Sequence, residues 1–213
     1  MISTTPLHVK RAGIYVYYRH NVLAEAEAEL LREAKCRNVH TEPALLPTVP
    51  ELHPKGTITT DGARLDIVAT GLYGRCERTF MDVRITHANT PSNRALNLEQ
   101  IYSRNENEKK RKYNSRVINT EKSTFVPLVF TTTGGQAPEC QRYHKRVAEL
   151  IASKRNENLP HVMSYIRTKI CFALLKSVLV SIHGVRGKQT RNNTPVKDIS
   201  FGLIPTEEMY ECR

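Results

Sequence analysis

Two aspartates stand in short strand-like segments at positions where apolar residues are expected. Asp66 lies in segment 65–70 and Asp82 lies in segment 80–85, and a glycine-bearing turn joins the two segments. Because strand side chains alternate between the two faces of a sheet, Asp82 and Arg84 are predicted to share one face while their neighbours point into a core. Carboxylates within a strand are costly to bury unless they are paired or bind a metal. This hairpin is therefore the first candidate for a functional site.

Two carboxylates and a cation on one strand pair suit the cleavage of a phosphodiester. A metal nuclease needs carboxylates close to one divalent cation and a positive group that steadies the charge developing on phosphate. Asp66 and Asp82 are predicted to bind Mg²⁺ or Mn²⁺, and Arg84 is predicted to contact the scissile phosphate. Arginine cannot act as a base, so the role of Arg84 would be electrostatic. The competing interpretation is an ion pair between Asp66 and Arg84 within the sheet, since a guanidinium suits a bidentate carboxylate partner.

A helix is predicted over residues 21–35, upstream of the hairpin. The segment is rich in Ala, Leu and Glu, Asn21 is a suitable N-cap, and apolar residues recur on one stripe. Glu25 is the candidate third acid of the site, with Glu42 in the next extended segment as a further helper. A solvated helix face is the competing interpretation of the acids on this helix.

Strands and helices are predicted through the rest of the chain as well. The strands are 39–46, 65–70, 80–85 and 125–131, and the helices after the hairpin are 94–118, 138–154 and 161–183. The last helix is apolar nearly all round, which predicts a central packing element. Segments 14–18 and 199–204 could each add a short strand. The order predicts an α/β (α+β) fold, a small mixed β-sheet flanked by helices with a restriction-endonuclease-like core.

The positive charge of the chain is concentrated in its second half. Residues 94–213 carry 21 basic and 11 acidic side chains, whereas residues 1–60 carry seven and six. This distribution indicates a polyanionic partner, with nucleic acid the first choice, although many basic proteins have no such partner. The residues predicted to hold the phosphate backbone without reading its sequence are Arg104, Lys109, Lys110, Lys112, Arg142, Lys145 and Arg146.

Cysteine spacing and hydropathy indicate the cellular compartment of the protein. The five cysteines are widely spaced and form no C-x-x-C pair, which is typical of neither a zinc ribbon nor a secreted disulfide framework. No apolar signal-peptide region follows Met1, and the most apolar run, residues 170–182, is too short to span a bilayer. An intracellular protein, nuclear or cytoplasmic, with no membrane partner is predicted.

Most of the chain, from about Arg19 to Gly187, resembles a group of uncharacterised mobile-element-derived proteins of animal genomes. In that family a PD-(D/E)xK nuclease-like region forms the C-terminal end of a longer polyprotein that often includes a reverse transcriptase. The segments that carry the resemblance are RHN (19–21), EP (42–43), DGARLDI (61–67), ERTFMDVRI (77–85), PSNRALNL (91–98), EKKRKY (108–113), FVPLVFTTTGG (125–135), YHKRVAELIASK (143–154) and IHGVRG (182–187).

The resemblance implies how the chain is divided. Residues 19–187 would form the nuclease-like domain, residues 1–18 an N-terminal extension, and residues 188–213 a basic, loose C-terminal tail. The zinc-binding segment that precedes this region in longer relatives is not in the chain, which suggests a fragment of a polyprotein or a decayed copy.

The resemblance also implies roles for the acids of the hairpin. The order of a PD-(D/E)xK site is a helix with an acid, a strand, a strand with Asp66, a strand with Asp82-Val83-Arg84, and a helix. The family usually reads RHNEIRD at the start of its first helix, whereas this chain has Val22 in place of the glutamate. Glu25, three residues on, is the matching acid.

Three hypotheses about function remain open at this point. The first is an Mg²⁺-dependent DNA endonuclease domain of transposable-element origin, a monomer or a homodimer, with DNA favoured over RNA. The second is a catalytically inactive nucleic-acid-binding module of a retroelement polyprotein, in which Asp66 and Arg84 pair and leave no room for a metal. The third is a structural domain with neither activity.

Overall fold

Four strands form one mixed sheet in the order in which they occur along the chain. The structure, a computed structural model, describes residues 7–186, and the side chains of residues 17–180 within them. The strands are β1 (Arg37–Thr41), β2 (Ile67–Thr70), β3 (Arg78–Thr86) and β4 (Thr124–Thr131). The pairs β1–β2 and β2–β3 are antiparallel, whereas β3 and β4 are parallel. The predicted α/β class with a mixed sheet is confirmed.

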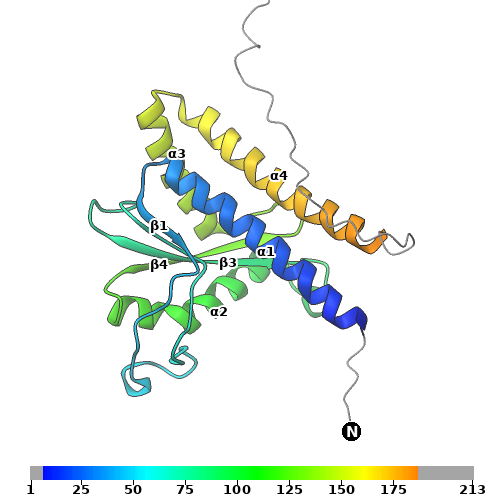
Figure 1. Ribbon diagram of the computed structural model, residues 1–213, viewed down its shortest axis with the longest axis horizontal. Helices are drawn as coiled ribbons and strands as arrows, with labels where there is room; N and C mark the ends of the chain where they lie inside the picture. Colours follow the sequence, from blue (N-terminus) through cyan, green and yellow to red (C-terminus); the bar gives the residue numbers. More distant parts are fainter. Residues whose placement is uncertain (1–6, 187–213) are drawn as a thin grey trace, which may run out of the picture.

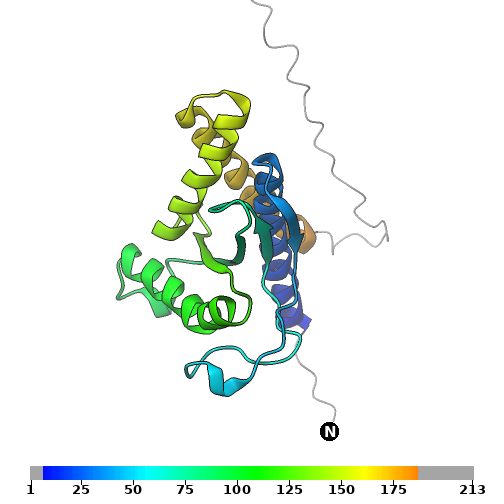
Figure 2. The same ribbon diagram turned by 90° about the vertical axis from the view of Figure 1, so that its left-hand side faces the viewer.

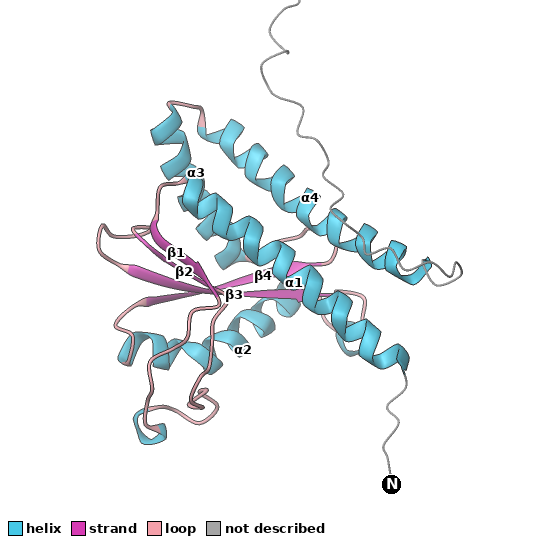
Figure 3. Ribbon diagram, in the orientation of Figure 1, coloured by secondary structure: helices cyan, strands magenta, loops and turns pink. Residues whose placement is uncertain are grey.

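Helices cover both faces of this sheet (Figures 1 and 2). They are α1 (Leu7–Glu33), α2 (Leu98–Asn119), α3 (Pro138–Arg155) and α4 (Leu159–Arg186). Short 3₁₀ turns occur at Pro50–Leu52 and Pro91–Asn93. The larger apolar core lies between the sheet and α1, α3 and α4, and the smaller one lies between the sheet and α2. Figure 3 shows these layers by secondary structure.

The parallel pairing of β3 with β4 explains the position of α2. Parallel neighbours require a crossover connection, and α2 is that crossover, so it packs on the sheet face opposite to α1. Successive residues of β3 consequently enter different cores. Met81 and Val83 lie in the core with α1, while Phe80 lies in the core with α2. The predicted alternation is confirmed, and Asp82 is on the α2 side.

The first helix is longer than predicted. It begins at Leu7 rather than at Asn21, so segment 14–18 is helical and the prediction of a strand there is wrong. Asn21 lies in the middle of the helix and is not its N-cap. The expected boundary between residues 18 and 19 also falls inside this helix. Composition around residues 14–18, with its tyrosines, favoured a strand, but packing of the rest of α1 sets the conformation.

The last helix packs at the outside of the molecule, so the prediction of a central element is wrong. Its buried stripe, formed by Val162, Ile166, Ile170 and Leu174, packs against the core that α1 and α3 share. Phe172 on the other side is 65% exposed. The predicted tail 188–213 and the predicted strand 199–204 lie outside the described residues. Within residues 7–186, no helix combines the length and apolar content needed to cross a membrane.

Candidate active site

The two predicted aspartates face each other across the β2–β3 hairpin. Ile67 is the register partner of Met81, which places Asp66, one residue before β2, opposite Asp82. The backbone N–H of Asp66 donates to the carbonyl oxygen of Met81 at 3.2 Å. The carboxylate oxygen Oδ2 of Asp66 accepts a 2.5 Å hydrogen bond from the N–H of Val83. The start of β2 is therefore fixed by the acid itself.

Asp82 is a nearly buried carboxylate with a lysine against it. The residue is 3% exposed, and its Oδ2 forms an ion pair with Nζ of Lys109 in α2. Burial, together with the negative charge of Asp66, raises the pKa of Asp82 to about 6, although the charge of Lys109 acts in the opposite direction. Two like charges and a nearby cation are the usual surroundings of a functional carboxylate.

His20 of α1 completes the contacts of Asp66. Its Nε2 lies 3.1 Å from Oδ2 of Asp66 and 3.2 Å from the carbonyl oxygen of Val83. Because both partners are acceptors, Nε2 carries the proton. The hydrogen bond to Asp66 is the largest cause that raises the pKa of His20, against the opposing effect of burial. His20 was not among the predicted site residues, although it is the middle residue of the RHN segment.

Arg84 does not pair with Asp66, in contrast to the competing interpretation of the sequence. Its nearest acid is Glu108 of α2, with 3.7 Å between Nη1 and Oε1. The cation next to the two aspartates is Lys109, which the sequence had suggested only as a contact for the phosphate backbone. Lys109, from the helix that follows the hairpin, is thus the cation beside Asp82, whereas Arg84, two residues after that acid, contacts Glu108. Only the fold reveals these pairings.

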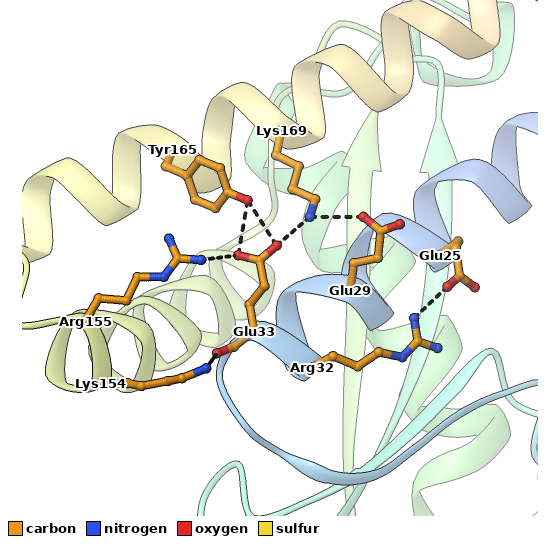
Figure 4. Close-up of polar contacts among 8 residues, drawn as sticks. All are labelled: Glu25, Glu29, Arg32, Glu33, Lys154, Arg155, Tyr165 and Lys169. Carbon is orange, nitrogen blue, oxygen red and sulfur yellow. Dashed lines mark hydrogen bonds and ion pairs between the residues drawn. The ribbon is translucent and has the colours of Figure 1, made fainter. Parts of the chain in front are cut away.

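Glu25 does not converge with the two aspartates. Its carboxylate is 2.7 Å from Arg32 of the same helix (Figure 4). Glu25 and Glu42 do line a cavity of about 240 Å³ that also borders Asp66 and His20. No three His, Cys, Asp or Glu side chains in the described part of the chain lie close enough together to hold one metal ion.

The seven predicted phosphate contacts divide into separate places. Arg104 and Lys109 line one cavity together with Arg84. Lys110 and Arg142 both lie beside Glu139, the latter at 3.8 Å. The others point elsewhere: Lys112 lies over the ring of Tyr113, Lys145 is exposed, and Arg146 donates to the carbonyl oxygen of Leu72 at 2.8 Å.

The cavity that Arg104 and Lys109 share has a volume of about 670 Å³. It lies between α1, the end of β3, the segment that leads to α2, and the first half of α2 itself. Its lining includes four cations and one carboxylate, Glu108, as well as His20 and His87. His20 borders this cavity and the smaller one, which Asp66 also lines, and the larger cavity reaches Asp82 through its neighbour Val83 and its ion-pair partner Lys109.

The donor set of this site suits Mg²⁺ or Mn²⁺. These ions take oxygen ligands and are commonly bound by one or two carboxylates together with water and substrate phosphate. Asp66 and Asp82 would supply the two carboxylates, and the raised pKa of Asp82 is the consequence expected where an acid is buried beside a second acid. A divalent cation between the two would offset that repulsion.

Comparison with known proteins adds no further constraint. No protein-family profile matches the chain, and a search of curated proteins found no match. The fold and the site geometry are therefore the basis for the function proposed below.

Proposed function

We propose that this chain is a metal-dependent nuclease domain that cleaves phosphodiester bonds in DNA. The observation that carries the proposal is Asp82, a carboxylate buried opposite Asp66 and in contact with Lys109, beside a cavity rich in cations. Two acids and a lysine beside a cavity lined by cations are suited to phosphodiester hydrolysis. The sequence resemblance described above supports a transposable-element origin.

Each residue has a distinct task in this proposal. Asp66 and Asp82 would hold Mg²⁺ or Mn²⁺, which polarises a phosphoryl oxygen and lowers the pKa of a bound water. The ammonium of Lys109 stabilises the negative charge that develops on the phosphoryl group. Arg84 binds a neighbouring phosphate oxygen, and His20 is a positioning residue because it fixes the carboxylate of Asp66.

Nucleic acid is the substrate class that the charge distribution supports best. The cavity carries four cations against one carboxylate, and Arg142 and Lys145 on α3 add exposed positive charge. Contacts of this kind bind phosphate irrespective of base sequence and weaken as salt rises. We therefore expect binding to supercoiled plasmid at low salt and its loss at several hundred millimolar salt.

Nicking of supercoiled plasmid by the purified full chain tests the proposal. We expect nicking with Mg²⁺ or Mn²⁺, and a loss of at least about 100-fold in Asp82→Ala and in Lys109→Ala, since each removes a group that acts on the reacting phosphate. Lys55→Ala removes one exposed charge outside the site and is the matched control. Equal nicking by wild type and Asp82→Ala would refute the enzyme.

A catalytically inactive nucleic-acid-binding module is the second candidate. It is favoured by one observation, namely that each aspartate already has partners: Asp66 contacts His20, and Asp82 contacts Lys109. This candidate predicts salt-sensitive DNA binding without nicking by any variant at any metal concentration. Its binding would also be unchanged in Asp82→Ala, whereas a nuclease that binds a divalent ion shows metal-dependent affinity that this substitution removes.

A further inference from the structure

We propose that the 670 Å³ cavity beside the aspartates receives one unpaired nucleotide, so that the substrate is DNA with an unpaired or extruded nucleotide next to the cleaved bond. This inference rests on the proposed nuclease function and adds the class of substrate to it. A phosphate group alone would occupy only a small part of such a cavity. Its volume is in the range of sites that enclose a whole small molecule, about 300–1,000 Å³.

The lining of the cavity suits both parts of a nucleotide. Arg84 and Lys109 lie at the side next to the aspartates and provide positive charge for the phosphate. Arg19, Arg104 and His87 add planar cationic or aromatic groups on which an unstacked base can lie. Glu108 is the one carboxylate in the lining, and it is held by Arg84 at 3.7 Å.

A buried amide is placed where a base edge would be read. Asn105 is 3% exposed and lines the cavity from the middle of α2. Its Nδ2 donates to the carbonyl oxygen of Ile101 at 2.7 Å, which fixes the orientation of the amide group. Asparagine is a poor residue for a helix interior, so the position is not explained by helix propensity. Amide groups can hydrogen-bond the edges of unpaired bases.

The wall of the cavity that Asn93 and Arg104 form is fixed by its own hydrogen bonds. Asn93 is 4% exposed, and its Nδ2 donates to the carbonyl oxygen of His87 at 2.9 Å. Its Oδ1 accepts a hydrogen bond from Arg104, which crosses the cavity wall from α2. A capping box between Asn97 and Gln100 then fixes the start of that helix. The cavity is thus formed by the protein itself and needs no ligand to shape it.

Extrusion of a nucleotide also accounts for the position of the cavity next to the two acids. An enzyme that acts at a base-paired strand must pay unstacking energy to bring one nucleotide into a pocket, and an unpaired nucleotide reduces that energy. A nucleotide in the cavity has its phosphate at the side where Lys109 and His20 lie. The adjacent phosphodiester then reaches the pair Asp66 and Asp82.

Binding of small probes tests the cavity without any cleavage. The full chain, free of divalent metal, is titrated with deoxyadenosine 5′-monophosphate, deoxyadenosine and inorganic phosphate, and binding is followed by amide NMR shifts or calorimetry. We expect the monophosphate to bind at least tenfold more tightly than either part. Arg104→Ala is expected to weaken the monophosphate at least fivefold, whereas Arg111→Ala, an exposed arginine on the same helix outside the cavity, leaves it unchanged.

A second variant separates cavity loss from misfolding. Ser92→Trp adds a large side chain to the exposed rim while it keeps every charge, so we expect loss of the monophosphate and unchanged thermal unfolding. Phosphate binding as tight as that of the monophosphate, or monophosphate binding that survives Ser92→Trp, would overturn the inference.

A cleavage assay distinguishes failure of the cavity from failure of the nuclease. Two otherwise identical duplexes are compared, one fully paired and one with a single-nucleotide bulge. We expect at least tenfold faster cleavage at the bulge. Equal rates on both would overturn the nucleotide cavity while the nuclease stands, whereas monophosphate binding without cleavage of either duplex would support the cavity and reject the nuclease.

Discussion

Helix α1 contributes to two carboxylate–histidine pairs that differ in access to solvent. Near its middle, His20 meets Asp66, and the two side chains are 31% and 20% exposed. Two turns on, Glu27 meets His144 of α3 with 2.9 Å between the atoms, and these side chains are 0% and 1% exposed. In both pairs, Nε2 of a histidine lies against a carboxylate oxygen. His20 of the first pair borders both cavities of the candidate site, and neither of these cavities is lined by Glu27 or His144.

The pair of Glu27 and His144, called the sealed pair below, is enclosed by further contacts. His144 packs against the rings of Tyr143 and Phe130, and its Nδ1 lies 3.0 Å from Oε1 of Gln136. Such a pair joins α1 to α3 through the larger core. An acid beside a histidine is therefore not by itself a site, because a substrate must also be able to reach it.

The largest expected effect comes from breaking the sealed pair. His144→Ala leaves the buried carboxylate of Glu27 without its partner, which costs about 3–5 kcal/mol in the free energy of unfolding. His20→Ala removes a hydrogen bond that is partly open to water and costs about 1 kcal/mol. Urea unfolding followed by circular dichroism measures both.

For the same two substitutions, the loss of nicking activity should be larger in His20→Ala than in His144→Ala, the reverse of their effect on the free energy of unfolding. His20→Ala is expected to lower plasmid nicking about 10–100-fold because Asp66 loses the group that orients it. His144→Ala should leave the nicking rate per folded molecule unchanged. The comparison fails if His144→Ala lowers the rate per folded molecule as much as His20→Ala does, or if His20→Ala is the more destabilising change.

Glu106 is another buried acid, but its partner is a backbone N–H and not a histidine. Glu106 of α2 is 8% exposed, and its Oε1 accepts a 2.9 Å hydrogen bond from the N–H of Glu139 in the first turn of α3. Ala137 at the N-cap of that helix provides no side-chain cap, so Glu106 replaces it from another element. Glu106→Ala should cost about 1–2 kcal/mol, whereas Glu106→Gln keeps an acceptor oxygen.

The pH dependence of Glu106 has a definite sign. Burial raises its pKa above the ordinary value of 4.5, so the folded chain binds this proton more tightly than the unfolded chain. The associated stability is present below pH 4.5 and is lost as the pH rises through the raised pKa. Urea unfolding from pH 4 to 8 should therefore show Glu106→Gln gaining stability relative to wild type as the pH rises. A difference that is constant with pH would contradict this assignment.

The strands of the hairpin and its two acids could be predicted because their signals are local. Alternation in β3 and the glycine-bearing turn predict two adjacent strands with one acid in each. The register that places Asp66 opposite Asp82 is seen only in the structure. The partners could not be predicted in the same way. Lys109 reaches Asp82 because α2 crosses over the parallel pair β3–β4, and His20 reaches Asp66 because α1 extends beyond its expected start. Both contacts depend on how helices pack.

On α2, contacts to other elements take the place of charge pairs within the helix. A spacing of four residues on α2 suits pairs of Glu106 with Lys110 and of Glu108 with Lys112. In the structure Lys110 instead contacts Glu139 of α3, and Glu108 contacts Arg84 of β3. Pairs four residues apart contribute only a few tenths of a kcal/mol, so contacts to other elements readily replace them. The same competition decided the partner of Arg84.

The smallest expected effect is a difference in thiol reactivity between the sealed and open regions. Cys140 is buried with its Sγ 3.8 Å from Nδ1 of His144, and burial raises the pKa of its thiol well above the ordinary value of 9.0. The thiolate is the reactive form, so proximity to a histidine does not activate this cysteine.

A short iodoacetamide pulse at pH 8, read by peptide mass spectrometry, should label the exposed Cys76 and Cys171 and spare Cys140 until urea unfolds the chain. His144→Ala should speed labelling of Cys140 because it opens the region. If Cys140 reacts as fast as Cys171 in the folded wild type, the region around His144 is not sealed, and the contrast between the two acid–histidine pairs disappears.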